Sequence, residues 1–533
     1  MQPFPYNTCT NVLILPTNKF MRIHPRLLYL LFIVTATSCS TTRVTNRDNG
    51  KMDVVFVQVN DVYEIAPVAG GKEGGMARVA TLKKEYLAKN PNTFLVMAGD
   101  FVSPSVYNSI QYLGKRIRGK QMVEVMTIAG TNLAIFGNHE FDIAESELQE
   151  RINESQFDWV SSNTFHKQNG KVVPFEKHQG TAVNPFPEKY IMRLKDADGT
   201  TVNIGVIGLT LPFNKADYVS YTDPLQAAKT IYAQLKDSCD AVIAVTHQAM
   251  ADDIRLAQEI PQLAAIIGGH EHDMRYQKVG NVYITQAHAN ARSAYVVQLH
   301  INKRKHKTEV ETSLKYLNES VAADSVTAEY VGKWTKIAND NYASLGFDAT
   351  KIVISSGETL DGRESEVRSH STNFTRLIAE AIAAACPQAD VVLMNSGSIR
   401  VDDLLTPPIT QYDILRTLPF GGGIVETEMK GRLLIKTLEV GRKNIGAGGF
   451  LVYHPLQFNA DSNTWTLNGK TIDPAKVYRV ALTDFLFSGK EANLDFLNKN
   501  NPDVLKAFEP ETNVKSSKSD IRLAIIRYLE NKK

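Results

Sequence analysis

The chain has 533 residues, of which 43% are apolar and 22% charged, which is the composition of an ordinary globular protein. Lys plus Arg total 59 and Asp plus Glu total 57, so the formal net charge of +2 provides no basic field for a nucleic acid polymer and no acidic tail. At roughly 150 residues per domain, this length predicts two to four domains. The four cysteines are too few and too scattered for a disulfide framework or a CxxC zinc site: Cys9, Cys39, Cys239 and Cys386.

The first 38 residues have the layout of a secretory leader. The apolar run LLYLLFIV, residues 27–34, follows Arg22 and Arg26 and precedes small residues, and it is shorter than the ~20 residues that span a bilayer. We therefore expect a lipoprotein-type signal peptide over 1–38. Met21 is a better start for such a leader than Met1, and the sequence leaves open at which of the two translation begins. Ala-Thr-Ser-Cys resembles a relaxed bacterial lipobox, which predicts lipidation of Cys39.

The polar stretch that follows predicts a flexible tether over 39–51. With Cys39 lipidated, the protein is exported and held to a membrane through its lipid anchor only, facing the periplasm or the cell surface. The alternative is a soluble periplasmic or secreted protein cut near Ser38.

Beyond the tether, short apolar runs alternate with helical patterns, which is typical of an α/β domain. The runs that we expect to be strands are Val54–Val59, Phe94–Ala98, Leu133–Phe136, Val202–Leu209, Ala241–Thr246 and Ala265–Gly268. Helical spacing of apolar residues covers Met76–Lys89, Met122–Ala129 and Asp252–Glu259. An extended pair, Val282–Gln286 and Ala294–Ile301, closes this region before the polar stretch Asn302–Thr312.

A connecting helix is indicated by the pattern of Ala328–Leu345, and a second α/β region begins near Ala349. We therefore expect a first domain over 52–315, a linker with the connecting helix over 316–348 and a second domain over 349–533.

Side chains that bind metals follow the predicted strands. In chain order they occur in Asn60-Asp61, Gly99-Asp100, Gly137-Asn138-His139-Glu140-Phe141-Asp142, His247 and Gly269-His270-Glu271-His272. In an open α/β sheet, ligands collect at the carboxyl ends of the strands, so we expect these residues to converge. Two carboxylates, one amide and three imidazoles suit borderline divalent ions such as Mn, Fe, Co, Ni or Zn. A pair of such ions can clamp the attacking and leaving oxygens of a phosphoryl transfer.

Three further motifs lie in the second region, and each contains glycine beside polar or aromatic residues. They are Asn395-Ser396-Gly397-Ser398-Ile399-Arg400, Leu418-Pro419-Phe420-Gly421-Gly422-Gly423 and Asp484-Phe485-Leu486-Phe487-Ser488-Gly489-Lys490-Glu491. Glycine at such positions permits the backbone to approach a ligand closely.

The whole set of motifs resembles the bacterial 5'-nucleotidase, UDP-sugar hydrolase and 2',3'-cyclic nucleotide phosphodiesterase family, over about Val54–Leu497. The resemblance implies an α/β fold with an N-terminal calcineurin-like metallophosphoesterase β-sandwich flanked by helices, the connecting helix, and a C-terminal α/β nucleotide-binding domain of the 5'-nucleotidase type. It also implies two divalent metal ions, which are Mn, Co, Zn, Fe or Mg.

Position by position, the resemblance assigns metal ligands and a catalytic dyad. Asp100 would bridge both ions, with Asn138, His247 and His270 completing one site and Asp61 and His272 holding the other. His139, oriented by Asp142, resembles the family's catalytic dyad, whose imidazolium stabilises charge on the phosphoryl and leaving groups.

One position departs from the family pattern. The family reads Asp-x-His after the first strand, whereas this chain reads Asp61-Val62-Tyr63. A neutral phenol is a poor ligand because its pKa is near 10. Three outcomes are open: Tyr63 ligates as a phenolate, a water takes the place, or that metal is labile. The second and third are favoured.

The resemblance also implies nucleotide contacts. Asn395 and Arg400 inherit nucleotide-binding roles, and Phe420 and Phe485 match the two aromatics that sandwich the base, a contact that contributes about 1–3 kcal/mol. Glu491 stands where the family has a ribose-binding Asp. Arg376 is the better phosphate or ribose candidate on the helix that precedes these motifs, and Arg368 is a weaker one.

The sequence thus predicts an exported dimetal phosphohydrolase that releases phosphate from a small-molecule nucleotide, as a 5'-nucleotidase does, by in-line attack of metal-bound hydroxide. A 2',3'-cyclic nucleotide 2'-phosphodiesterase of the same architecture is the close alternative. Because of Tyr63 and Glu491, a catalytically degenerate nucleotide-binding lipoprotein is the alternative from another class. The sequence leaves the oligomeric state open.

Overall fold

The computed structural model describes residues 48–213 and 216–532. The predicted leader, Cys39 and residues 39–47 of the predicted tether lie outside the described residues, so the predictions made for them stay predictions. Asp48–Lys533 forms one compact unit. Within it we call Lys51–Tyr316 the N-terminal region and Ile352–Asn531 the C-terminal region.

The first sheet of the N-terminal region has six strands in the order β19-β18-β1-β2-β5-β6. They are β19 (Lys307–Tyr316), β18 (Ser293–Asn302), β1 (Lys51–Val59), β2 (Thr93–Met97), β5 (Leu133–Ala134) and β6 (Asp158–Trp159). β1, β2, β5 and β6 run parallel, with Phe56 opposite Phe94. β18 is antiparallel to β1, and β19 is antiparallel to β18.

The second sheet also has six strands, in the order β11-β12-β14-β15-β17-β16. They are β11 (Tyr190–Lys195), β12 (Thr201–Thr210), β14 (Ala241–His247), β15 (Ala265–Gly268), β17 (Val282–Gln286) and β16 (Arg275–Val279). The four central strands are parallel and the two outer ones are antiparallel to their neighbours.

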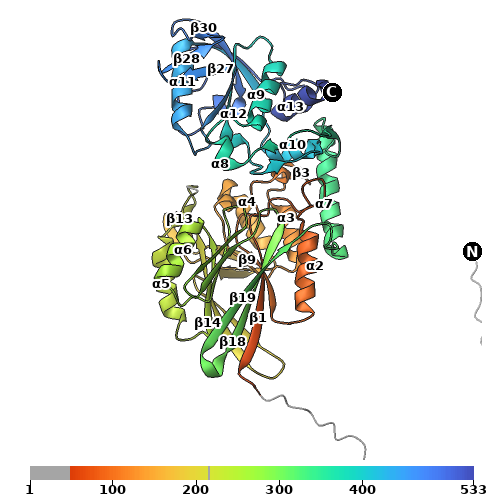
Figure 1. The fold of residues 1–533 in the computed structure, drawn as a ribbon, viewed down its shortest axis with the longest axis vertical. Helices are drawn as coiled ribbons and strands as arrows, with labels where there is room; N and C mark the ends of the chain where they lie inside the picture. The colour runs from red at the N-terminus through yellow and green to blue at the C-terminus, as the bar shows by residue number, and fades with distance from the viewer. Residues whose placement is uncertain (1–47, 214–215, 533) are drawn as a thin grey trace, which may run out of the picture. The chain divides into compact units, whose positions relative to one another are not determined.

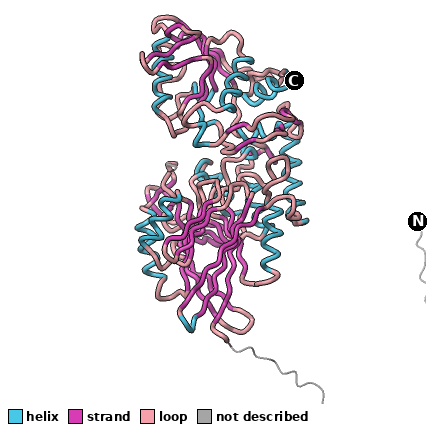
Figure 2. Tube along the Cα trace, viewed as in Figure 1, coloured by secondary structure: helices cyan, strands magenta, loops and turns pink. Residues whose placement is uncertain are grey.

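The two sheets pack face to face through one apolar cluster. Phe56 and Val96 of the first sheet, together with Ile135 just after β5, meet Ile204 and Ile243 of the second sheet, and all five are fully buried. The strands contain many β-branched residues, which fit such a pleated, buried surface. Figure 2 shows these strands together with helices outside them. The sandwich flanked by helices that the sequence predicts is confirmed.

Helices cover both outer faces of the sandwich (Figure 1). α5 (Pro224–Leu235) and α6 (Met250–Glu259) pack on the second sheet. α2 (Met76–Leu87), α3 (Lys120–Ala129) and α4 (Glu145–Glu154) pack on the first. The start of α5 is fixed by Pro224 at its first position and by the Asp223 carboxylate, which accepts from Gln226 N at 2.8 Å.

Several elements differ from the sequence prediction. The polar stretch that was expected to end the region lies partly in strand β19, and β5 is shorter than the predicted Leu133–Phe136. The helices α4 and α5 and the strands β6, β11 and β16 were not predicted. Neither was a further set of short strands: β3 (Gln111–Tyr112), β4 (Lys115–Arg116), β7 (Thr164–Gln168), β8 (Lys171–Val173), β9 (Glu176–Gln179), β10 (Ala182–Pro185) and β13 (Val219–Tyr221). These short strands belong to small two- and three-stranded sheets. Their sequences contain no long apolar run that would have predicted them.

The connecting helix is α7 (Ser325–Ser344), close to the predicted Ala328–Leu345. Its N-cap is Asp324, whose carboxylate accepts from Thr327 N at 3.0 Å. Trp334 and Tyr342 of α7 are buried in a cluster that continues into both regions.

The C-terminal region is built on a five-stranded sheet in the order β26-β22-β30-β25-β31. Its strands are β26 (Leu451–His454), β22 (Val391–Asn395), β30 (Val477–Thr483), β25 (Ile424–Lys430) and β31 (Val504–Phe508). Only β22 and β30 pair in parallel. The main helices are α9 (Asn373–Ala385), α11 (Gly431–Lys443) and α13 (Ile521–Asn531), with the short helices α8 (Glu364–Val367), α10 (Gln411–Thr417) and α12 (Asp484–Phe487).

Smaller sheets complete this region. β20 (Ile352–Ile354) pairs with β24 (Ile409–Thr410), β21 (Leu360–Asp361) pairs with β23 (Leu404–Leu405), and β27 (Leu456–Asn459), β28 (Thr464–Leu467) and β29 (Lys470–Thr471) form a three-stranded sheet. In the part of the chain that the structure describes, no helix has both the length and the apolar character needed to cross a membrane.

Candidate functional site

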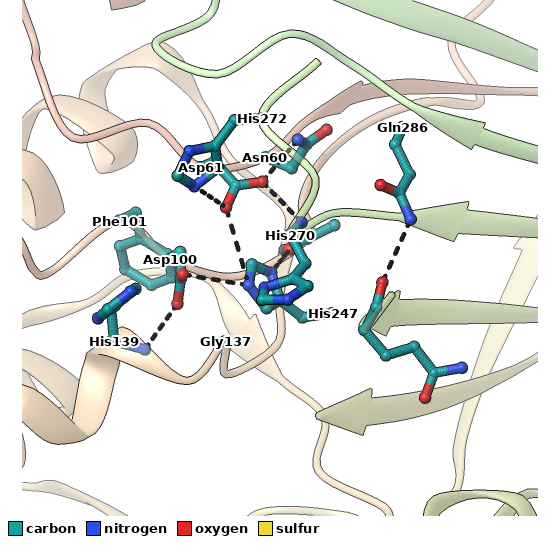
Figure 3. Close-up of polar contacts among 12 residues, drawn as sticks. Asn60, Asp61, Asp100, Phe101, Gly137, His139, His247, His270, His272 and Gln286 are labelled. Atoms are coloured by element: carbon teal, nitrogen blue, oxygen red, sulfur yellow. Dashed lines mark hydrogen bonds and ion pairs between the residues drawn. The ribbon is translucent and has the colours of Figure 1, made fainter. Parts of the chain in front are cut away.

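The predicted metal ligands come together where the strands end. Asp61 follows β1, Asp100 follows β2, and Asn138 comes shortly after β5. His247 is the last residue of β14, while His270 and His272 follow β15. In Figure 3 the two carboxylates and His247 point toward one another. The convergence that the sequence predicts is therefore present.

Asp61, Asp100 and His247 form the centre of this cluster. Each offers one ligand atom, and these atoms all lie within 4.8 Å of one another. The Nε2 atom of His247 is 3.1 Å from Asp100 Oδ2 and 3.8 Å from Asp61 Oδ1. Its other ring nitrogen, Nδ1, donates to the carbonyl oxygen of Ala98 at 2.7 Å. That bond turns Nε2 toward the carboxylates, as a metal-binding imidazole requires.

The neighbouring charges favour the ionised forms of Asp61 and His247. Burial raises the pKa of Asp61, but the charge of His247 and the hydrogen bond to His272 outweigh burial and hold this pKa below its usual value. Burial lowers the pKa of His247, but Asp100 and Asp61 outweigh it and raise this pKa to about 10. Two ionised carboxylates therefore face the protonated ring of His247. Binding of a metal cation at Nε2 would displace that proton.

Four of the six predicted ligands have an unusual backbone conformation. The φ angles of Asp61, Asp100, His270 and His272 are 53°, 54°, 102° and 59°. L-residues with side chains rarely adopt such angles, and each costs on the order of 1–3 kcal/mol unless the surroundings impose it. Gly137 shows how crowded those surroundings are, because a Cβ atom there would lie 2.1 Å from Asp100 Oδ1. The fold thus holds these ligands in strained positions.

Asn138 provides the test of whether a metal fits. Its side chain is buried, and its Oδ1 atom has no hydrogen-bond partner among the residues that the structure describes. A buried amide oxygen without a partner is rare in a folded protein. It lies beside His139, whose N–H donates to Asp100 Oδ1 at 2.8 Å. Together with the mixed oxygen and nitrogen donor set, this oxygen fits a divalent cation.

Glu140, which the sequence analysis gave no role, fixes two of the loops. Its buried carboxylate accepts from four backbone N–H groups, those of Gly137, Phe101, Asp100 and Val102, at 2.6, 2.8, 2.9 and 3.0 Å. It therefore ties the loop after β2 to the loop after β5. No motif of the sequence marks it other than its place between His139 and Asp142.

His139 and Asp142, which are predicted to form a catalytic dyad, lie in contact. His139 Nδ1 lies 2.6 Å from Asp142 Oδ2, and Ser103 Oγ donates to the same oxygen at 3.4 Å. Arg400 of the C-terminal region reaches the ring, with its NH2 group 3.1 Å from His139 Nε2. His139 is thus in contact with a guanidinium group that lies 261 positions further along the chain.

Tyr63 lies among the predicted ligands. Its hydroxyl is 2.9 Å from His272 Nε2 and 3.3 Å from both Asp61 Oδ1 and Asp100 Oδ2. Burial, followed by the charges of Asp100 and Asp61, raises the pKa of Tyr63 well above its usual value. The group is accordingly a neutral phenol at neutral pH.

His272 is oriented by a residue that the sequence analysis did not single out. Its Nδ1 atom bonds to Asp402 Oδ2 of the C-terminal region. The sequence gives no signal for this contact, because Asp402 lies two positions beyond the motif that ends at Arg400.

A pocket of about 370 Å³ opens beside the cluster. His139, His270 and His272 line it from the N-terminal region, and Arg363 and Arg368 line it from the C-terminal region. Arg275 lines it as well, and each of these three guanidinium groups pairs with a carboxylate. Four acidic residues are also part of the lining: Glu271, Asp273, Glu364 and Asp402.

The predicted nucleoside contacts form a separate group. Asn395 Nδ2 donates to Glu491 Oε2 at 2.7 Å, and Ser398 Oγ donates to Asn395 Oδ1 at 2.8 Å. Phe420 and Phe485 are 60% and 45% exposed, which is unusual for phenylalanine.

Phe420 lies in the turn after α10 and Phe485 lies in α12. The two segments are neighbours, because Gly423 N donates to Asp484 Oδ2 at 3.0 Å. Neither ring, nor Asn395 or Glu491, lines the pocket beside the metal ligands.

Arg376 is exposed on α9 and does not line that pocket either, whereas Arg368 does. The roles of all these residues stay predictions.

Comparison with known proteins identifies two domains. A family model for calcineurin-like phosphoesterases matches residues 54–274, and a model for the 5'-nucleotidase C-terminal domain matches residues 352–498. The chain carries a calcineurin-like phosphoesterase domain followed by a 5'-nucleotidase C-terminal domain. The matched residues contain the whole metal cluster in the first case and the motifs around Asn395, Phe420 and Phe485 in the second.

Curated relatives of this chain extend over most of its length. Protein UshA of Escherichia coli K12 is 24% identical over 531 residues, covering 88% of this chain and 91% of that protein. The 5'-nucleotidase of Vibrio cholerae is 24% identical and the one of Homo sapiens 23% identical, and each alignment covers 78% of this chain. The chain is therefore a homologue of metallophosphoesterase hydrolases.

Solved structures share the fold. The 5'-nucleotidase precursor of Thermus thermophilus superposes with a TM-score of 0.67 at 20% identity, covering 90% of this chain and 97% of that one. The sulfate thiohydrolase SoxB from a Thermus source gives a TM-score of 0.61 at 15% identity, covering 90% of this chain and 94% of that one. Because proteins of different chemistry share this fold, the substrate must be argued from the site.

Proposed function

We propose that the protein is an exported dimetal phosphohydrolase that releases phosphate from nucleotides. The observation that carries the proposal is the convergence of Asp61, Asp100 and His247 beside the buried, unpartnered Oδ1 atom of Asn138. His139 and Arg400 stand next to this cluster, where a phosphoryl group would be bound.

The ligands divide into two sets. Asp100 would bridge the two ions, Asn138, His247 and His270 would complete one site, and Asp61 and His272 would hold the other. Two divalent ions bound there would neutralise phosphoryl oxygens and bring the pKa of a bound water toward neutrality.

The dyad and Arg400 act on the phosphoryl group. Because Asp142 accepts from His139 Nδ1–H, the Nε2 atom is the one presented to a substrate. Arg400 NH2 lies 3.1 Å from Nε2, so both groups would contact the same phosphoryl oxygens and stabilise their charge in the transition state. Arg368 would add a contact from the wall of the pocket.

The nucleoside would be held by the C-terminal region. Phe420 and Phe485 would stack on the base, which their high exposure supports. Asn395 and Glu491, which are hydrogen-bonded to each other, would bind the base and the ribose hydroxyls. Arg376 is the further candidate for the phosphate or ribose.

For the residues outside the described part, we propose lipidation of Cys39 and anchoring to a membrane that faces the periplasm or the cell surface. The leader pattern of residues 1–38 supports this proposal.

The decisive experiment measures phosphate release from AMP by the purified protein loaded with Mn²⁺ or Co²⁺. We expect hydrolysis that His139→Ala reduces about 10²–10⁴-fold in kcat with unchanged metal content. The matched control is His300→Ala, which removes an exposed imidazole paired with Asp53 and should keep full activity.

A panel containing AMP and a 2',3'-cyclic nucleotide separates the two hydrolytic functions, because the metals and the dyad serve both. Tight AMP binding without phosphate release from any member of the panel would contradict the proposal and favour the binding lipoprotein.

A further inference from the structure

Two imidazoles of the metal cluster are anchored in different ways. His247 Nδ1 donates to the carbonyl oxygen of Ala98, in the loop between β2 and Asp100, so the N-terminal region anchors this ring by itself. His272 Nδ1 instead bonds to Asp402, 130 positions away in the C-terminal region. The orientation of one predicted ligand therefore depends on a side chain from the other region.

We propose that Asp402 is a positioning residue that fixes the tautomer and orientation of His272, so that one metal ion of the pair is bound fully only when the C-terminal region is docked. The inference deepens the proposed function and rests on it, because it takes His272 as a metal ligand.

The chemistry of the pair sets the tautomer. An ionised carboxylate only accepts hydrogen bonds, so the proton of this contact belongs to His272 Nδ1. The Nε2 atom is then free to carry a lone pair, and it points at the cluster, 3.4 Å from Asp61 Oδ1 and 2.9 Å from the Tyr63 hydroxyl. A carboxylate on the far nitrogen also makes an imidazole a stronger ligand.

Asp402 is itself held rigidly. Its Oδ1 atom accepts from Glu364 N, and its side chain is only 21% exposed. Its φ angle of 41° lies in the left-handed region, which a residue other than glycine keeps only when its surroundings impose it. Both carboxylate oxygens are thus committed, one to each partner.

The segment around Asp402 contacts the N-terminal region at three successive points. Arg400 reaches His139, Asp402 reaches His272, and Asp403 pairs with Arg292. Of these three contacts, only the one made by Asp402 involves a predicted metal ligand. His272 is therefore oriented by Asp402 only while the C-terminal region is docked on the N-terminal region.

Loss of the Asp402 carboxylate should weaken the binding of one metal ion only. Asn138, His247 and His270 come from the N-terminal region and have no contact with Asp402 among the described hydrogen bonds and ion pairs. The site with Asp61 and His272 has Tyr63 where the family has an imidazole, so it depends more strongly on His272.

The first test titrates the metal-free full chain with Mn²⁺ by calorimetry, in the wild type and in Asp402→Ala. We expect two ions in the wild type, and in the variant a 10–100-fold weaker affinity for one of them and an unchanged affinity for the other. Asp402→Asn offers one acceptor oxygen for two donors and should give an intermediate value.

Asp403→Asn is the matched control. Asp403 is the adjacent residue and is similarly buried, with 13% exposure. It bonds to Arg292 across the same contact and to Arg416 within the C-terminal region. Asn keeps the size of the side chain and one acceptor oxygen, so this variant should leave the C-terminal region docked and the bond from Asp402 to His272 in place. We expect its metal affinities to stay within threefold of the wild type, whereas equal weakening in Asp402→Ala and Asp403→Asn would overturn the inference.

A second readout follows the tautomer of His272 directly, by long-range ¹H–¹⁵N NMR of the metal-free protein labelled at histidine and assigned with His272→Gln. We expect an Nδ1–H tautomer or an imidazolium in the wild type and an Nε2–H tautomer in Asp402→Ala. An unchanged ring signal would overturn the inference. A wild type that binds no ion would instead overturn the proposed function, while the ring signal would still decide the role of Asp402.

Discussion

The carboxylate of Glu140 accepts hydrogen bonds from the backbone of two loops that carry metal ligands. Burial, followed by the charge of Asp100, raises the pKa of Glu140 to about 7, so the stability comparison belongs at pH 8.5, where the group is ionised. Hydrogen bonds to a charged group contribute about 1.5–3 kcal/mol each, and a buried N–H left without an acceptor costs about 1–3 kcal/mol. In Glu140→Gln, one oxygen becomes an amide that faces N–H donors. We expect a loss of about 2–4 kcal/mol in the free energy of unfolding, measured in urea with chelator present.

The control for this variant is Glu145→Gln, five residues further along. Glu145 is 50% exposed and bonds to His166 at 2.6 Å, so its neutralisation should cost less than about 1 kcal/mol. If both variants lose the same stability, Glu140 does not organise the loops.

Tyr63 stands where the resemblance of the sequence motifs implies a metal-binding imidazole. Its hydroxyl contacts Asp61, Asp100 and His272, all predicted ligands, but a neutral phenol binds a divalent cation poorly. In Tyr63→His, an imidazole replaces it. We expect affinity for the more weakly bound ion to rise about tenfold, or about 1.4 kcal/mol, in a Mn²⁺ titration.

Tyr63→Phe serves as its control, because it removes the hydroxyl without adding a ligand and should show no such gain. Unchanged metal content and activity in Tyr63→His would contradict this account of the position.

At the residue scale, the sequence could reveal the candidate metal ligands but not the residues that hold them in place. Asp61, Asp100 and His247 follow apolar runs directly, and the ends of parallel strands meet at one edge. Glu140 and Asp402 have roles that arise only when distant loops come together, so no local pattern marks them.

At the scale of elements, prediction succeeded where burial leaves a run of apolar residues. β1, β12 and β14 are buried almost throughout and were expected close to their observed bounds. β19 has mostly exposed or half-buried residues and is held by its pairing with β18. Its core-facing Val310 and Leu314 are separated by polar residues, so the sequence shows no apolar run there.

Helix α6 contains a buried acid that makes stability depend on pH. Asp253 accepts from Gln248 Nε2 and Gln286 Nε2 at 3.0 Å each, and burial raises its pKa to about 7. The unfolded chain releases this proton near pH 3.9. Between about pH 4 and pH 7 the unfolded state binds fewer protons, so the contribution of Asp253 to stability falls as pH rises, by up to about 1.4 kcal/mol per unit.

Asp253→Asn removes this ionisation. We expect the variant to gain stability relative to the wild type when the pH is raised from 5 to 8, measured by urea unfolding with chelator present. The exposed neighbour Asp252→Asn should show the wild-type pH dependence, and an identical slope in all three proteins would refute the assignment.

At the scale of the whole molecule, the two regions share one apolar cluster. Phe101 of the N-terminal region, Trp334 and Tyr342 of α7, and Phe374 and Ile525 of the C-terminal region all belong to it. Such continuity predicts that Asp48–Lys533 unfolds cooperatively. The order of the domains was predictable from motifs, but this shared core was not, because it assembles residues more than 400 positions apart.

If the molecule unfolds cooperatively, metal binding in the N-terminal region also stabilises the C-terminal region against unfolding. A ligand at 100 times its dissociation constant stabilises the native state by about 2.7 kcal/mol per site when the unfolded chain does not bind it. The three tryptophans report on different parts: Trp159 in β6, Trp334 in α7 and Trp465 in β28. Trp465 packs in a separate cluster with Leu438 and Leu456.

With fluorotryptophan in place of tryptophan, ¹⁹F NMR in urea follows all three positions without a substitution in the core. We expect one common midpoint for the three native signals. Diamagnetic Zn²⁺ at 100 times its dissociation constant should shift all three together, by about 2.7 kcal/mol for each ion bound. A shift confined to Trp159 would show that the C-terminal region unfolds independently. The link through Asp402 would then have too little strength to transmit metal binding across the molecule.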